Sequence, residues 1–184
     1  MKKRLFALAI SVSITACTAV KENISMLTAV KVERFNSAGD KYYEKPASAF
    51  MKPLTDGSAE YFIGYDTYGG GFEQVAFNSR NTDQYSQFID KYLEWEKIAT
   101  KDGDLLEKAI GDTKSTYNGM SATLNFSIFS ANQNTHYLVI KSCVIGSCTD
   151  SITLDRTNAI VLRAELVKLG SGELLKRPDE SKYR

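Results

Sequence analysis

Residues 120–129, MSATLNFSIF, alternate between apolar and polar side chains more regularly than any other part of the chain. Successive side chains of a β-strand point to opposite faces, so Leu124, Phe126 and Ile128 would share one face of an extended strand. Asn125 and Ser127 would lie on the other face. This pattern predicts a strand that is buried on one side only, as in an antiparallel sheet.

The strand has partners further along the chain. A second apolar run at 137–140 follows the polar residues 132–134, which predict a turn. A third run at 151–154 follows the stretch 143–148, where a glycine favours a hairpin end. These runs together predict an antiparallel meander.

An earlier hairpin is indicated by two aromatic and β-branched runs, residues 60–65 and 72–77, joined by a glycine-rich tip at 66–71. A first strand is expected at 29–35. Residues 41–57 contain two of the three prolines and are expected to be irregular.

The clearest helix follows residue 81. Asn81 is expected to cap it, Gln84 to complete a capping box, and Gly103 to end it. Its apolar side chains recur at helical spacing and are Tyr85, Phe88, Ile89, Tyr92, Trp95 and Ala99. Residues 105–110 fit either a further helical turn or a short strand.

Residues 158–169 combine a helical composition with a partly alternating pattern. We predict a helix because Asp155 and Thr157 offer caps and Gly170 a stop. The order of elements predicts an α+β fold, in which an antiparallel sheet (hairpin plus meander) carries two helices packed on one face.

The N-terminus has the three parts of a secretory signal peptide. Lys2, Lys3 and Arg4 precede an almost entirely apolar run at 5–14, and small residues follow. About ten apolar residues in a helix cover roughly half of the ~30 Å hydrocarbon core of a bilayer. A cleaved signal explains this segment better than a membrane-spanning helix.

The signal ends in Ile14-Thr15-Ala16-Cys17, which resembles the lipobox of bacterial lipoproteins. The resemblance implies that the Cys17 thiol receives a diacylglyceryl group, that residues 1–16 are removed, and that the new amino terminus is acylated. Several acyl chains would anchor the protein stably. Thr18, where an aspartate would favour the inner membrane, implies the outer membrane, facing the periplasm. The alternative is an ordinary signal cut near Ala16, with Cys17 a spare thiol.

The predicted organisation is therefore a signal peptide at 1–16, a lipidated tether at 17–27, a single α+β domain at 28–170 and a loose C-terminal tail at 171–184. The 168 residues left after cleavage suit one domain with its own core.

Removal of the signal also changes the charge. The whole chain has a net charge of +1, but three of its 23 Lys and Arg precede Cys17, which leaves 20 against 22 Asp and Glu. The remainder is slightly acidic and has no basic run to neutralise a row of phosphates. Nucleic acid is therefore not an expected partner.

Cys143 and Cys148 form an even pair once Cys17 is assigned to lipid, and an oxidising compartment favours a disulfide between them. A metal pair and a redox-active pair are the alternatives. Two thiols alone make a poor metal site, and the spacing lacks the two-residue gap of thioredoxin-like motifs. No metal and no cofactor are expected.

The hairpin tip is the candidate binding loop, with Asp66, Tyr68, Gly69, Gly70 and Gly71. Consecutive glycines allow unusual backbone geometries, and the neighbouring aromatic residues offer rigid contact surface. A mobile hairpin end is the plainer interpretation. No Lys-Ser/Thr follows the glycines, so the tip is not a phosphate-binding loop.

Two residues are candidates for chemistry. Glu96 falls inside the apolar face of the first helix, where burial can produce a general acid, although a structural salt bridge or a helix end explains it equally well. His136 is the only histidine, and a histidine at a strand end is more typical of a surface residue. No nucleophile elbow or zinc-protease motif accompanies it.

The leading hypothesis is a non-enzymatic lipoprotein that is held in the membrane by its anchor and binds a protein or another envelope component. The alternatives are a periplasmic hydrolase or accessory enzyme that uses Glu96 or His136, and an envelope inhibitor or exclusion factor.

Overall fold

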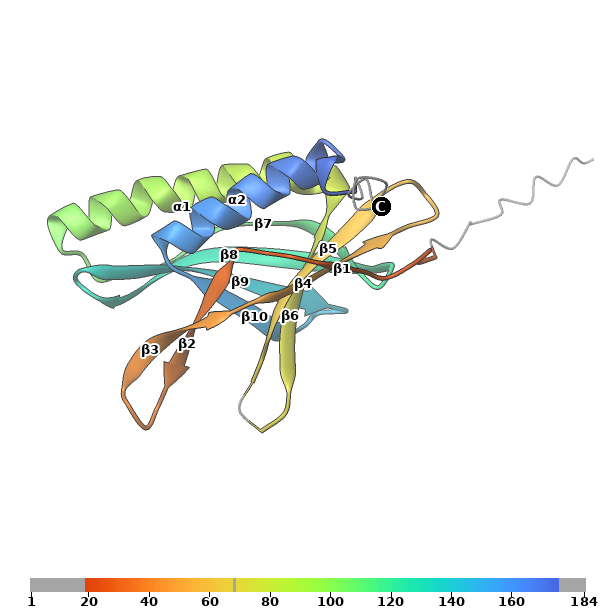
Figure 1. Ribbon diagram of the computed structural model, residues 1–184. Coiled ribbons are helices and arrows are strands. Elements are labelled where there is room, and N and C mark those ends of the chain that lie inside the picture. Colours follow the sequence, from red (N-terminus) through yellow and green to blue (C-terminus); the bar gives the residue numbers. More distant parts are fainter. Residues whose placement is uncertain (1–18, 68, 176–184) are drawn as a thin grey trace, which may run out of the picture.

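The computed structural model describes residues 19–67 and 69–175. Within them lie two four-stranded antiparallel sheets, a separate two-stranded hairpin and two α-helices (Figure 1). The predicted α+β class with antiparallel sheets is confirmed, but the strands form two four-stranded sheets and a two-stranded one rather than a single sheet. The predictions for residues 1–16, Cys17 and Tyr68, and for the tail beyond residue 175, lie outside the described residues.

The first sheet has the order β1-β4-β5-β6. Its strands are β1 (Ile24–Met26), β4 (Ser48–Pro53), β5 (Ala59–Asp66) and β6 (Phe72–Asn78). The β5–β6 pair confirms the predicted hairpin. Strand β1 pairs with β4, and Val20 forms a bridge with Leu54, so part of the segment expected as a tether lies against the domain.

The expectation of an irregular segment at 41–57 is wrong. It contains β4 and also β3 (Lys41–Pro46), which pairs with β2 (Lys31–Asn36) in the separate hairpin. Pro46 and Pro53 are the last residues of their strands, where a missing N–H breaks no ladder in the strand interior. The prolines therefore end strands here and do not prevent them.

The second sheet is the predicted meander, with the order β10-β9-β8-β7. Its strands are β7 (Glu107–Tyr117), β8 (Met120–Asn132), β9 (Thr135–Val144) and β10 (Ser147–Leu154). Of the two options for 105–110, the strand is observed from Glu107 onwards. The strand register shifts between Ala109 and Gly111, and this irregularity obscures the alternation in the sequence.

Helix α1 (Thr82–Asp102) begins after the short 3-10 helix η1 (Ser79–Asn81), and Gly103 ends it in the left-handed conformation as expected. The predicted capping box is wrong. The Asn81 side chain makes no cap hydrogen bond and donates to the Lys114 carbonyl instead, while Gln84 accepts from the Thr113 hydroxyl. Contacts with the neighbouring strand β7 have replaced the local cap.

Helix α2 (Arg156–Gly170) confirms the choice of helix for residues 158–169. The Asp155 carboxylate caps it by accepting the Asn158 N–H at 2.7 Å. A short 3-10 helix, η2 (Glu173–Leu175), follows. Helix α1 contacts α2 and strands β7, β8 and β9, and α2 contacts β9 and β10.

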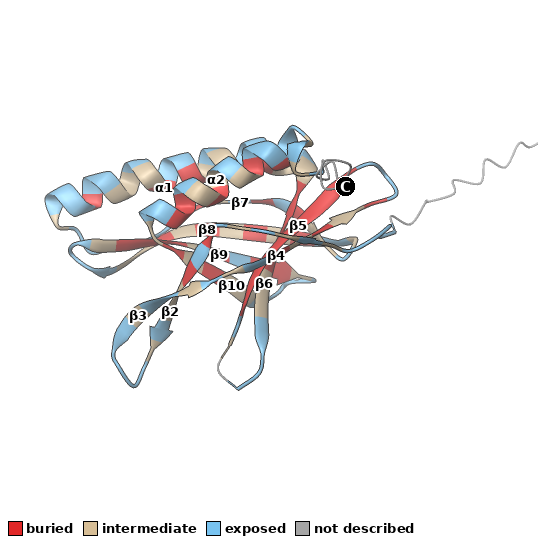
Figure 2. Cartoon of the chain, in the orientation of Figure 1, coloured by how far each residue is buried: buried red, intermediate tan, exposed pale blue. Residues whose placement is uncertain are grey.

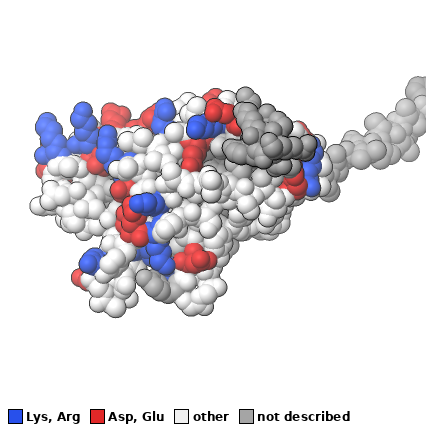
Figure 3. All heavy atoms as spheres, viewed as in Figure 1, with Lys and Arg blue, Asp and Glu red and all other residues white. Residues whose placement is uncertain are grey.

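The core joins both sheets to the helices. The buried Tyr85 ring on α1 packs against Phe77 of the first sheet and Phe126 of the second, with ring centroids 5.4 and 6.1 Å apart. Buried residues lie where the helices face the strands, whereas most of hairpin β2–β3 is exposed (Figure 2). Lys and Arg are interspersed with Asp and Glu on the face drawn in Figure 3, and no large patch of one sign forms there.

Candidate binding pocket

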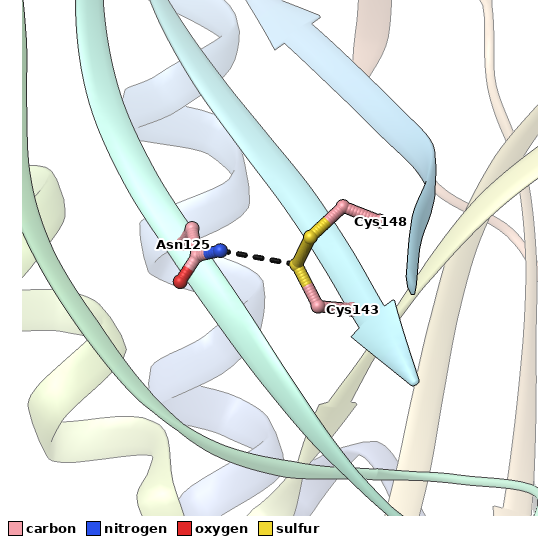
Figure 4. The surroundings of a disulfide bond; sticks show 3 residues. All are labelled: Asn125, Cys143 and Cys148. Carbon is pink, nitrogen blue, oxygen red and sulfur yellow. Dashed lines mark hydrogen bonds between the residues drawn. A yellow bond between two sulfur atoms is a disulfide. The ribbon is translucent and has the colours of Figure 1, made fainter. Parts of the chain in front are cut away.

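The predicted disulfide is present. Cys143 and Cys148 are bonded and face each other in register across the β9–β10 hairpin, and Asn125 on the adjacent strand donates to Cys143 Sγ at 3.0 Å (Figure 4). The hairpin turns through Ile145 and Gly146, whose φ angles are 51° and 78°. Two residues with positive φ are typical of the type I′ turn.

Glu96 takes part in an ion pair. Its carboxylate lies 2.5 Å from Nη1 of Arg156, at the start of α2, and also accepts from the Thr100 hydroxyl. The side chain is 15% exposed. Of the explanations offered by the sequence, the salt bridge is the one observed, and it ties the two helices together.

His136 is buried, so the expectation of a surface residue is wrong. Its Nδ1 is hydrogen-bonded to Ser130 Oγ at 2.7 Å, and Ser130 Oγ also accepts the Leu106 N–H. The Tyr92 hydroxyl donates to the His136 carbonyl. The packing of α1 over the start of β9 explains the burial.

The glycine-rich tip closes on itself, because the Thr67 N–H donates to the Gly71 carbonyl at 2.7 Å. Gly69 and Gly70 have φ angles of 92° and 84°, in the region that glycine adopts without strain. The role of the tip as a binding loop stays a prediction.

A pocket that the sequence did not indicate lies between hairpin β2–β3 and the adjoining ends of β8 and β9. It is open and has a volume of about 580 Å³. That volume is within the roughly 300–1,000 Å³ typical of small-molecule sites. Its lining residues are Phe35, Asp40, Lys41, Tyr42, Phe129, Ala131, Asn132, Thr135 and Tyr137. Neither Glu96 nor His136 is among them.

Four aromatic rings form one wall of the pocket. The Tyr42 ring is central, with centroids 5.3 Å from Phe35, 4.6 Å from Tyr137 and 6.4 Å from Phe129. The rings are tilted by 41–57° relative to one another. Phe35 is 47% exposed, so the wall is reached from solvent at its outer end. We call these four side chains the aromatic wall.

Hairpin β2–β3 is held in place by its opposite face. Arg34 of β2 lies over the Tyr65 ring at 5.6 Å and 3.6 Å from a carboxylate oxygen of Glu73. Lys45 of β3 donates to the Asp66 carbonyl. Hairpins β2–β3 and β5–β6 accordingly project beside each other from the body of the domain (Figure 1). These contacts fix the angle at which Phe35 and Tyr42 meet the meander.

Polar groups surround the aromatic wall. Asp40 ends the β2–β3 turn with φ of 49°, a left-handed conformation that aspartate tolerates well. The side-chain oxygen Oδ1 of Asn132 accepts the Asn134 N–H. The side-chain NH2 group of Asn132 is left as a donor. Within residues 19–67 and 69–175, no side-chain hydrogen bond reaches the hydroxyls of Tyr42, Thr135 or Tyr137, or the Asp40 carboxylate.

Tyr137 is the most informative of these residues. The residue is only 7% exposed, yet its hydroxyl makes no hydrogen bond within the part of the chain that the structure describes. Burial, together with the nearby Glu33 carboxylate, raises the pKa of Tyr137 to about 12. The phenol therefore keeps its proton at physiological pH, as donor and acceptor. The hydroxyl oxygen is not enclosed by the protein, so a ligand in the pocket can reach it.

A signal for this pocket exists in the sequence but is weak. Phe129 and Tyr137 fall on the side of their strands opposite the core residues Phe126, Ile128 and Leu138. Two aromatic residues on this more polar face indicate a contact beyond the main core. Tyr42 could not be linked to them because residues 41–57 gave no strand pattern.

Comparison of the sequence with protein-family models gives no match, and no curated protein matches it either. Neither α1 nor α2 is long and apolar enough to cross a bilayer. No group of three or more His, Cys, Asp and Glu within the described ranges is placed to hold a metal ion. The geometry of the pocket is therefore the main indication of function.

Proposed function

We propose that this protein is a lipid-anchored binding module of the bacterial cell envelope. Acylated Cys17 holds it at the inner leaflet of the outer membrane, facing the periplasm, and an envelope component occupies the pocket beside the aromatic wall. The observation that carries the proposal is the open pocket beside the aromatic wall, where the hydroxyls of Tyr42, Thr135 and Tyr137 make no side-chain hydrogen bond within the described residues.

The arrangement of the elements supports this role. We propose that α1 and α2 together cover one face of the meander, which agrees with their contacts to β7–β10. Phe129 and Tyr137 lie at the strand positions that alternate with the core-facing residues. The pocket would therefore open on the face of the meander away from the helices. The helices and the core would then provide stability, and the two projecting hairpins would shape the binding surface.

The anchor is tested with Cys17→Ser and Thr18→Asp, each expressed with metabolic labelling by a fatty acid. Cys17→Ser should abolish the label and either release the protein or stall its processing. Thr18→Asp should keep the label and move the protein towards the inner-membrane fraction in an enteric-type host. Unchanged labelling and membrane retention of Cys17→Ser would overturn the anchor.

The binding role is tested by site-specific photocrosslinking in intact cells. A photoreactive residue at Thr135, in the pocket, should give an adduct that depends on ultraviolet light. The matched control is Ile160, which is 47% exposed on α2 and outside the pocket. Identical adduct patterns from the two positions, or none from Thr135, would contradict the proposal.

The alternative functions require other features of the structure. A hydrolase that uses Glu96 or His136 needs one of them in an accessible site, but Glu96 is paired with Arg156 and His136 is buried against Ser130. An inhibitor or exclusion factor would give a protein adduct in the crosslinking experiment. No further observation on the described residues favours either alternative over the binding module.

A further inference from the structure

We infer that the ligand of the pocket is an uncharged saccharide, bound with the apolar face of a sugar ring against the aromatic wall. This inference rests on the proposed binding function and adds the chemical class of the ligand. It follows from three properties of the pocket: the shape of the wall, the charge of its lining and the polar groups at its rim.

The wall offers a ligand a continuous apolar surface. Tyr42 packs directly on Phe35 and Tyr137, so these rings form a continuous surface and do not surround a central point. Aromatic faces carry partial negative charge, and the C–H bonds on one face of a pyranose present partial positive charge to them. An aromatic cage for a quaternary ammonium group would instead need rings that converge on one cation.

The charge of the lining argues against an anionic ligand. Two of the lining residues are charged at neutral pH, Asp40 and Lys41, and they have opposite signs. The Lys41 ammonium group lies 4.7 Å from the centroid of the Tyr43 ring, on the other face of the hairpin. The pocket therefore lacks the cluster of cations that a phosphate or another strong anion requires.

The rim offers the hydrogen bonds that a saccharide needs. The Asp40 carboxylate accepts, the Asn132 amide donates, and the hydroxyls of Thr135, Tyr42 and Tyr137 do both. None of these groups is used by the fold within residues 19–67 and 69–175. A ligand with several adjacent hydroxyls and an apolar ring face satisfies this set, whereas a lipid chain or an aliphatic side chain leaves it unpaired.

The inference is tested with the purified full-length lipoprotein in detergent, applied to an array of uncharged oligosaccharides. Hits are quantified by calorimetry. Trimethyl-lysine and inorganic phosphate serve as the rival probes, and neither should bind. Tyr42→Ala should weaken saccharide binding about tenfold, which corresponds to about 1.4 kcal/mol, because the central ring of the stacking surface is lost. Tyr137→Phe removes only the hydroxyl and should weaken binding severalfold.

The matched control is Tyr43→Ala. Tyr43 is the next residue of the same strand, is 40% exposed and points to the opposite face of the hairpin. The Tyr43→Ala variant should bind saccharide as tightly as the unchanged protein does. Equal losses in Tyr42→Ala and Tyr43→Ala, with both variants folded by circular dichroism, would overturn the inference.

These experiments distinguish an error in the ligand class from an error in the proposed function. If no saccharide binds but a photoreactive residue at Thr135 still gives a specific adduct, the binding module stands and the ligand class is wrong. If the array, the rival probes and the crosslinking are all negative, the proposed function itself fails. Binding of trimethyl-lysine in place of saccharides would identify the pocket as a cation site and overturn the inference.

Discussion

Glu165 on α2 joins the helix to two distant parts of the chain, and its removal gives a sharp test of the structure. Its carboxylate accepts from the Tyr61 hydroxyl at 2.7 Å and from the Thr28 hydroxyl at 2.9 Å. It also accepts the Ala29 N–H at 3.2 Å. The perturbation is Glu165→Ala, which removes one acceptor from three donors.

The three donors are not equivalent. Tyr61 is 1% exposed, so its hydroxyl cannot turn to water, and a buried donor without a partner costs about 1–3 kcal/mol. Thr28 is half-buried and should contribute about 1 kcal/mol. Ala29 is exposed, and water can replace the lost acceptor. We expect a total loss of about 2–4 kcal/mol in the free energy of unfolding.

The assay is urea unfolding followed by circular dichroism, with Glu94→Ala as the control. Glu94 is exposed on α1, and its replacement should change the free energy of unfolding by less than about 0.5 kcal/mol. In a Tyr61→Phe background, Glu165→Ala should cost at least ~1 kcal/mol less than in the unchanged protein. Strict additivity, or equal costs for Glu165→Ala and Glu94→Ala, would refute the reasoning.

Two further predictions concern the disulfide and alkaline pH. Reduction of Cys143–Cys148, or its replacement by two serines, should lower the free energy of unfolding by about 2 kcal/mol, because a short loop in the unfolded chain is released; unfolding midpoints that are equal with and without dithiothreitol would contradict this. Burial raises the pKa of Tyr65 and Tyr137 to about 12 and also raises the pKa of Tyr61. The unfolded chain loses these protons near pH 10 and the folded chain retains them, so stability should fall as pH rises above about 10. Phenolate absorbance should show these tyrosines ionising late, and a single transition near pH 10 without loss of stability would be inconsistent with the burial.

Much of the local structure could be predicted from the sequence. The alternation of Leu124, Phe126 and Ile128 identified β8, and helical spacing identified α1. The Cys143–Cys148 pair could be assigned because its partners lie within one hairpin. These features depend on residues a few positions apart, whose periodicity follows directly from strand and helix geometry.

Other local features could not be predicted because tertiary contacts override local preferences. Asn81 and Gln84 have the pattern of a capping box, but their side chains bond to strand β7 instead. The sequence around His136 gives no sign of burial, because Tyr92, more than forty residues earlier, covers it. Each residue responds to a neighbour that is remote in the chain.

The sequence by itself determined both helices, the β5–β6 hairpin and most of the meander, which face of most of these elements is apolar, the disulfide pair, and the expectation of a lipid anchor at Cys17. Only the tertiary structure divided the strands among three sheets and brought Tyr42 to Tyr137, and Tyr61 to Glu165. The physical reason is that the spacing of apolar residues indicates which side of a helix or strand is buried, but not which other element packs against it. That choice depends on how well distant surfaces fit together, and the candidate pocket arises from such a choice.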